Sequence, residues 1–152
     1  MIQNSLFKVA EVQLTYNPTF KAIERPKITK AHDAYPILLD NWDIDQISLI
    51  EEFKILLLNR RNNVLGIAAI SKGGVSETVV DAKVIFSIAL KCCACGIILA
   101  HNHPSGELFA GREDTELTRK LKAAGKLLDI QVLDHLIISA DGFYSFADEG
   151  MM

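Results

Sequence analysis

Apolar residues along the chain follow two different spacings, which together predict a mixture of strands and helices. Runs that alternate or stay apolar between turn residues predict strands at 51–59, 64–71, 96–100, 130–139 and 143–147. Apolar residues three to four positions apart predict helices within 40–52, 78–93 and 112–128. Turn residues at 60–63 and 140–142 join neighbouring strands into hairpins. The order of these elements favours an α/β (α+β) fold, in which a mixed β-sheet is flanked by helices.

The two longer predicted helices each carry one apolar face that we expect to pack on the sheet. Between them, the strand at 96–100 is apolar throughout, which predicts burial on both faces of the sheet. The residues on the helical faces are Val80, Val84, Ile88 and Cys92 in the first helix and Leu117, Leu121, Ala124 and Leu128 in the second.

Residues 1–40 differ from the rest because Pro18, Pro26 and Pro36 interrupt short alternating runs. This pattern predicts strands and extended connections, which we interpret as an N-terminal extension of the same domain. The chain of 152 residues has about the length of one domain, so we expect a single domain over 1–152.

Composition and charge narrow the class of protein. Hydrophobic residues make up 49% and charged residues 23%, as in ordinary globular proteins. The net charge of −3 argues against a protein whose main task is to neutralise nucleic-acid phosphates. A basic run is present, but its spacing is that of the solvated side of a helix. It comprises Arg119, Lys120, Lys122 and Lys126.

The apolar segment Val84–Ala100 resembles a membrane span in length, but Lys91, Gly96 and three cysteines interrupt it. A helix that runs into a buried strand explains this segment, so we expect no membrane association. Cysteines 92, 93 and 95 are odd in number and too close together for a disulfide framework, which favours a reducing, cytoplasmic location. We interpret them as packing residues at a helix-to-strand junction.

The most informative polar residues follow the apolar strand, where Asn102 separates His101 from His103. In an extended backbone, residues two apart point to the same side, so these histidines can present two imidazoles to one metal ion. The alternative is a pair of loop histidines that make ordinary hydrogen bonds. Asp114 lies near the start of the next helix, in register with Leu117 on its inward face, and is the natural third ligand of a zinc ion whose fourth ligand is water.

A hydrolytic zinc site also needs a proton acceptor. Glu51 would share a strand face with apolar residues such as Phe53, whereas Glu52 would share its face with Lys54, so we prefer Glu51. His135 lies in an apolar strand, and we interpret it as a core histidine with a local hydrogen-bond partner, such as Asp134, in preference to a ligand.

The segments "EEFKILLLN", "IILAHNHPSG", "RED" and "LDHLIIS" resemble the RadC family of JAMM-type (JAB/MPN) metalloprotein domains, over about Ile28 to Gly150. The resemblance implies a JAMM fold related to that of cytidine deaminase. It implies that His101, His103 and Asp114 hold Zn²⁺ with a water as fourth ligand, and that Glu51 is the general acid/base. The activity it implies is zinc-dependent hydrolysis of a peptide or isopeptide bond in a protein or peptide substrate.

One position departs from the family pattern. Seven residues separate the second histidine from a Ser in the pattern, whose hydroxyl helps to stabilise the oxyanion, and at that position this chain has Gly111. Ser105 is a nearby hydroxyl that could serve as an accessory group. Loss of one oxyanion donor costs roughly 100-fold in rate or more, so the resemblance implies a metal site more firmly than a reaction.

Two alternatives to a metallohydrolase therefore remain open. One is a catalytically weakened metal-binding JAMM scaffold that recognises a partner, and the other is an accessory protein of DNA repair. Longer RadC proteins carry a helix-hairpin-helix DNA-binding module, and we expect this chain to be a short form without it. A nucleic-acid partner is therefore the least favoured, and the sequence leaves the oligomeric state open.

Overall fold

The computed structural model describes residues 6–13, 15–74 and 79–152, and its strands form one mixed sheet. The elements in chain order are a 3₁₀ helix η1 (Ala22–Glu24), α1 (Ala31–Asp40), β1 (Glu52–Leu58), β2 (Val64–Lys72), α2 (Ala82–Lys91), β3 (Gly96–Asn102), α3 (Arg112–Leu127), β4 (Gln131–Ser139) and β5 (Gly142–Ser145). The strand order is β2-β1-β3-β4-β5. Strands β3 and β4 are parallel, and the other neighbours are antiparallel. This sheet with its flanking helices confirms the predicted fold class.

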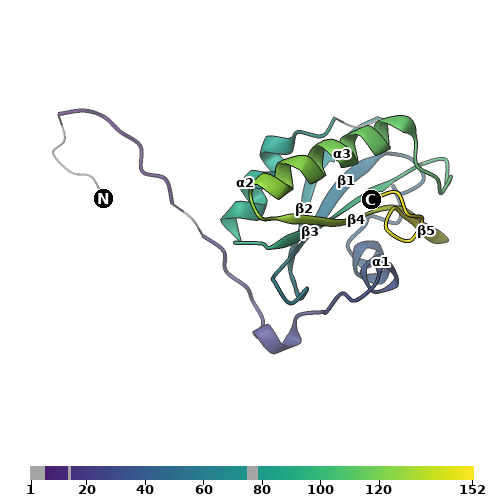
Figure 1. The fold of residues 1–152 in the computed structure, drawn as a ribbon, viewed down its shortest axis with the longest axis horizontal. Helices are drawn as coiled ribbons and strands as arrows, with labels where there is room; N and C mark the ends of the chain where they lie inside the picture. Colours follow the sequence, from purple (N-terminus) through teal and green to yellow (C-terminus); the bar gives the residue numbers. More distant parts are fainter. Residues whose placement is uncertain (1–5, 14, 75–78) are drawn as a thin grey trace.

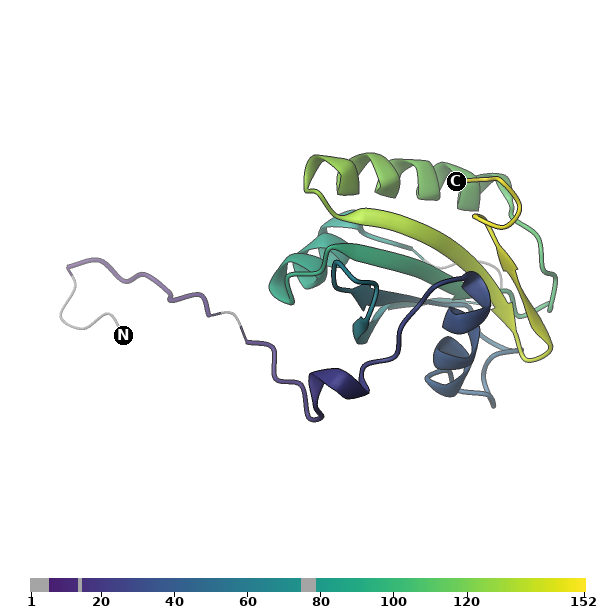
Figure 2. The same cartoon turned by 60° about the horizontal axis from the view of Figure 1, so that its bottom comes forward.

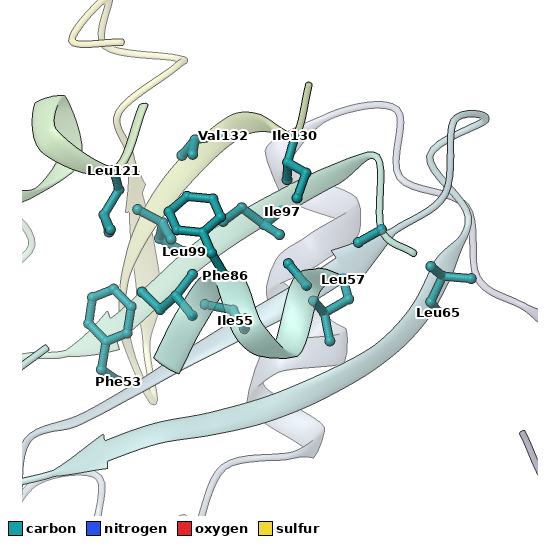
Figure 3. Close-up of a cluster of buried hydrophobic side chains, with 13 residues drawn as sticks. Phe53, Ile55, Leu57, Leu65, Phe86, Ile97, Leu99, Leu121, Ile130 and Val132 are labelled. Carbon is teal, nitrogen blue, oxygen red and sulfur yellow. The ribbon is translucent and has the colours of Figure 1, made fainter. Parts of the chain in front are cut away.

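Helices α2 and α3 cover one face of the sheet and α1 covers the other (Figures 1 and 2). Side chains therefore alternate between two cores along each central strand. In β3, Ile97 and Leu99 belong to the hydrophobic cluster under α2 and α3, which is drawn in Figure 3. Ile98 and Ala100 point to the opposite face and pack toward α1. Every residue of β3 is buried, as the apolar run predicts.

The helix that precedes β3 is shorter than predicted, and its apolar face is rotated. Helix α2 begins at Ala82 because the Asp81 carboxylate accepts a hydrogen bond from the Lys83 amide, 2.9 Å away. Val80 therefore lies before the helix, and Val84 is 39% exposed. Thr78, where the helix was expected to begin, lies outside the described residues. The buried residues are Ile85, Phe86 and Ala89, while Ile88 and Cys92 of the predicted face pack against the same core at its edge.

Helix α3 agrees with the predicted bounds within one residue. Leu121 is fully buried, and Leu117 and Ala124 pack against the same core. Leu128 follows the helix and is 43% exposed, so the predicted apolar face ends one turn early.

Residues 6–13 and 15–40 form none of the expected strands, but the expected extended backbone is present. It forms an arm that runs outward (Figures 1 and 2), followed by η1 and α1. Asp33 caps α1 by accepting hydrogen bonds from the backbone amides of Thr29 and Lys30. Pro36 lies inside this helix, where its missing amide removes one helical hydrogen bond. Burial of Leu38 and its neighbours against the sheet outweighs that loss.

The short helix expected within 40–52 was also wrong, because turns connect α1 to β1. Trp42 and Ile47 are buried here, but Ile44 is 56% exposed. The buried residues are thus five positions apart, which no helical face provides.

The apolar stretch Val84–Ala100 is the junction of α2 with β3. Cys92 packs against the core, Cys93 is exposed in the connecting turn, and the cysteine thiols are free. Among residues 6–13, 15–74 and 79–152, the structure contains no helix that is both long enough and apolar enough to cross a membrane.

Candidate metal centre

His101 and His103 lie where β3 ends, on the sheet face that carries α2 and α3. Antiparallel pairing places Phe53 of β1 beside His101, and the two rings stack with their centroids 6.0 Å apart. His101 is 3% exposed, whereas His103 lies just beyond the strand and borders solvent. Their Nε2 atoms are 3.0 Å apart, so the two imidazoles converge on one point.

Asp114 approaches the same point from the first turn of α3. Its carboxylate oxygens lie 3.3 Å from His101 Nε2 and 3.5 Å from His103 Nε2. One of these oxygens also accepts a hydrogen bond from the Gly111 amide, 2.9 Å away, which fixes the carboxylate at the helix start. Burial raises the pKa of Asp114, but its hydrogen bonds with the two histidines outweigh burial and hold that pKa well below its usual range.

The separations of these donor atoms are close to those in a tetrahedral zinc site. Zn–N and Zn–O bonds of about 2.0–2.1 Å place the ligand atoms of a tetrahedron roughly 3.3 Å apart. The two nitrogens are 3.0 Å apart, and the Asp114 carboxylate approaches them through different oxygens, with Oδ1 at 3.3 Å from His101 and Oδ2 at 3.5 Å from His103. His103 Nδ1 lies 3.0 Å from the Glu107 carbonyl oxygen, which only accepts, so Nδ1 carries a proton. The hydrogen bond with Asp114 raises the pKa of His103. The point between the two Nε2 atoms and the carboxylate therefore favours a cation, which is a proton shared with an imidazole in the metal-free protein and a metal ion when one is bound.

Glu51 lies beside this cluster, immediately before β1. Its side chain is buried, and one carboxylate oxygen belongs with the two histidines to a group whose ligand atoms are all within 4.8 Å of one another. This group alone could hold a metal ion, and the Asp114 carboxylate offers a further ligand at 3.3 Å from His101 Nε2 and 3.5 Å from His103 Nε2. Glu52 points elsewhere and pairs with Lys54 at 3.5 Å.

Asn102 was not singled out by the sequence reasoning, although it separates the two histidines. Alternation along β3 turns its side chain to the α1 face, where it is fully buried. The amide nitrogen donates to the carbonyl oxygens of Ile47 and Ile50, at 2.7 and 2.9 Å, and the amide oxygen accepts from the Glu52 amide at 2.8 Å. Asn102 thus fastens the segment that carries Glu51 to the strand that carries the histidines.

His135 of β4 lies directly behind His101. The prediction of a buried core histidine is confirmed, because its exposed fraction is 0%. Asp134 bonds to the backbone amide of His135 and not to its ring, which instead contacts His101 and Thr118. Burial holds the pKa of His135 well below its usual value, so the ring is neutral. Thr118 was also missed, because a lone threonine on a helix gives no signal in the sequence.

The two accessory positions lie on the segment between β3 and α3. Ser105 is exposed, and its hydroxyl accepts a hydrogen bond from the Glu107 amide at 3.3 Å. Gly111 precedes α3 in an extended conformation that any residue adopts. A Cβ atom at this position would lie 3.3 Å from the Asp114 carboxylate, so a side chain there would begin next to the converging donors.

A cleft of about 970 Å³ opens beside the donor atoms. Glu51, His103 and Asp114 contribute to its wall, together with the half-exposed ring of Phe109. A second cleft of about 840 Å³ lies at another part of the surface, and Lys122 and Lys126 of the basic run line it. The first cleft therefore combines a polar cluster with room for an extended ligand.

Comparison with known proteins gives the relationship of the chain. A family profile described as "RadC-like JAB domain" matches residues 28–151. A "UPF0758 protein" of Flavobacterium johnsoniae is 46% identical over 125 residues, or 82% of this chain and 53% of that protein. One of Porphyromonas gingivalis is 40% identical over 140 residues, which cover 89% of this chain and 59% of that protein.

The chain spans about half the length of the curated relatives it matches. The aligned part includes all the strands of the sheet and the residues of the cluster. On this match, the chain belongs to the RadC-like JAB domain family.

Proposed function

We propose that this protein is a zinc-dependent metallohydrolase that cleaves a peptide or isopeptide bond. The observation that carries the proposal is the convergence of His101, His103 and Asp114 at 3.0–3.5 Å, beside a cleft whose wall includes His103 and Asp114. Two imidazole nitrogens and one carboxylate oxygen are ligands that suit zinc, and three protein ligands leave a position for water.

In this proposal, Glu51 is the general acid/base. A bound zinc ion would supply Lewis acidity toward a carbonyl group and lower the pKa of water. Glu51 takes a proton from the attacking water and returns it to the leaving nitrogen. Its burial beside the cluster supports this role, because a carboxylate close to the reacting atoms and shielded from bulk water is suited to such a transfer.

A second candidate function is a metal-binding scaffold with little hydrolytic activity, and Gly111 is the observation that favours it. Where the resemblance has a serine, this chain has Gly111, which brings no hydroxyl to a position that borders the Asp114 carboxylate. The expected loss in rate is roughly 100-fold or more.

We infer a cytoplasmic location from the three free thiols, and a protein or peptide as the partner.

Zinc content tests the metal site directly. Protein purified without added metal is expected to hold one zinc ion per chain, and Asp114→Ala is expected to hold much less. Elemental analysis of both proteins decides the matter, because equal zinc content would rule out Asp114 as a ligand. Glu51→Gln is expected to keep its zinc, whereas loss of zinc in this variant would assign Glu51 to the ligand set.

Activity requires a separate comparison. The wild type, Glu51→Gln, Gly111→Ser and Gly111→Ala are screened side by side against peptide and isopeptide substrates. Gly111→Ala is the matched control, since it adds a Cβ atom without a hydroxyl. Turnover by the wild type that Glu51→Gln abolishes supports the hydrolase, and activity found only in Gly111→Ser supports the scaffold.

A further inference from the structure

Four polar groups form a continuous chain behind the donor atoms, inside the core. It runs from His101 Nδ1 to His135 Nε2 at 2.8 Å, then from His135 Nδ1 to Thr118 Oγ1 at 2.7 Å. It ends at the Asp114 carbonyl oxygen, 2.7 Å from Thr118 Oγ1. The chain thus starts on one proposed metal ligand and ends on the backbone of another.

The last acceptor fixes where each proton lies. A carbonyl oxygen only accepts, so the Thr118 hydroxyl donates its single proton to the Asp114 carbonyl oxygen. The Thr118 oxygen therefore accepts at its other contact, and His135 must donate from Nδ1. The His135 ring is fully buried, and burial favours the neutral imidazole, which carries one proton, so Nε2 is left with a lone pair.

That lone pair decides the protonation of the next ring. His135 Nε2 accepts from His101, which places the proton of His101 on Nδ1. The other nitrogen, Nε2, then presents its lone pair to the point where His103 and Asp114 converge. The opposite tautomer would place a proton there.

The two histidines differ in how their second nitrogen is controlled. His103 Nδ1 faces the Glu107 carbonyl oxygen, which can only accept. His101 faces another imidazole, which can donate or accept according to its own tautomer. The hydroxyl of Thr118 removes that ambiguity, because its proton is already committed to the Asp114 carbonyl.

We propose that His135 and Thr118 are positioning residues that hold His101 in the Nδ1-protonated tautomer and aim its Nε2 lone pair at the metal position. The role in metal binding rests on the zinc site proposed above, whereas the tautomer is a property of the metal-free protein. Packing supports the orientation, because the His135 ring stacks on Phe146 with centroids 4.7 Å apart and meets Phe53 edge-on at 5.6 Å.

The decisive variants are Thr118→Val and Thr118→Ser, with Thr115→Val as the matched control. Serine keeps the hydroxyl, and valine replaces it with a methyl group of similar size. Thr115 makes the same kind of bond, from its hydroxyl to the Gly111 carbonyl oxygen four residues earlier, but has no contact with His135. The control therefore measures the cost of losing such a bond in α3 alone.

Two readouts are used. Long-range ¹H–¹⁵N correlation spectra of metal-free protein show which ring nitrogen of each histidine carries the proton. Wild type and Thr118→Ser are expected to show His101 protonated at Nδ1, and Thr118→Val to shift the proton toward Nε2. Zinc affinity, measured by competition with a chelating dye, is expected to fall about 10- to 100-fold in Thr118→Val and to change less than about threefold in the other two variants.

Each outcome bears on one proposal. Protonation of His101 at Nε2 in the wild type, or an unchanged tautomer and affinity in Thr118→Val, overturns the positioning role. Failure of every variant and of the wild type to bind zinc overturns the metal site, while the spectra still decide the tautomer. If Thr118→Val does not fold, His135→Gln and His135→Leu make the same comparison, since the glutamine oxygen can still accept from His101.

Discussion

The amide of Asn102 offers a sharp test of how the site is assembled. Three hydrogen bonds of 2.7–2.9 Å join this buried side chain to the first residue of β1 and to the segment that precedes it. Asn102→Ala leaves two carbonyl oxygens and one amide without these partners. An unsatisfied buried group costs about 1–3 kcal/mol, so with partial rehydration we expect a loss of roughly 3–5 kcal/mol in the free energy of unfolding.

Asn102→Asp is expected to give a loss that depends on pH. The new carboxylate keeps the acceptor for the Glu52 amide but faces the carbonyl oxygens of Ile47 and Ile50. Burial and these oxygens raise the pKa of the new carboxyl in the folded state above its unfolded value of about 3.9. The folded state then binds the proton more tightly, so the variant is most stable at low pH and loses stability as pH rises through the raised pKa.

Urea unfolding followed by circular dichroism at pH 5 and pH 8, with chelator present, measures the effect. Asn41→Asp is the matched control, because the Asn41 amide donates to the Ile37 carbonyl oxygen in an exposed position. We expect a loss below about 1 kcal/mol for this control at both pH values. Equal free energies of unfolding for Asn102→Asp and Asn41→Asp at both pH values would refute the role of Asn102 in joining these segments.

Three further predictions concern stability. Asp134 accepts three hydrogen bonds, and burial raises its pKa. We expect Asp134→Asn to lower the free energy of unfolding by less than about 1 kcal/mol and Asp134→Ala to lower it by about 2–4 kcal/mol. Thermal unfolding measures both, and equal losses would contradict the prediction. A Cβ atom on Gly125 would lie 2.3 Å from a backbone carbonyl oxygen, whereas one on Gly66 would meet nothing within 4 Å. We therefore expect Gly125→Ala to lower the free energy of unfolding by more than about 2 kcal/mol and Gly66→Ala to leave it almost unchanged. Zinc at about 100 times its Kd should stabilise the wild type by about 2.7 kcal/mol, so chelation should lower Tm by roughly 5–10 °C but leave the Tm of Asp114→Ala unchanged.

The sequence predicted the central elements because their patterns are strong. The hairpins and the buried strand β3 have alternating or continuous apolar residues between clear turns. The convergence of His101 and His103 follows from the same periodicity, since residues two apart in a strand share a face. Such local rules needed no knowledge of the tertiary structure.

The errors arose where tertiary packing overrides local signals. Pro36 indicated a break, yet α1 forms around it because one side of that helix is buried against the sheet. The positions of His135 and Thr118 relative to His101 depend on the pairing of β3 with β4 and on the packing of α3. No spacing within the chain records that contact, so the sequence alone could not reveal it.

The register of β3 has a consequence for how this domain can vary. Strand β3 is bonded to β1 on one side and β4 on the other, and it presents its two histidines on alternate residues. An insertion or deletion of one residue within β3 would turn both imidazoles to the α1 face and direct Asn102 toward the cleft. Residues 104–110 lie outside the sheet, so substitutions of their side chains do not shift that register. The side chains at the rim of the cleft can therefore vary while the donor atoms stay in place.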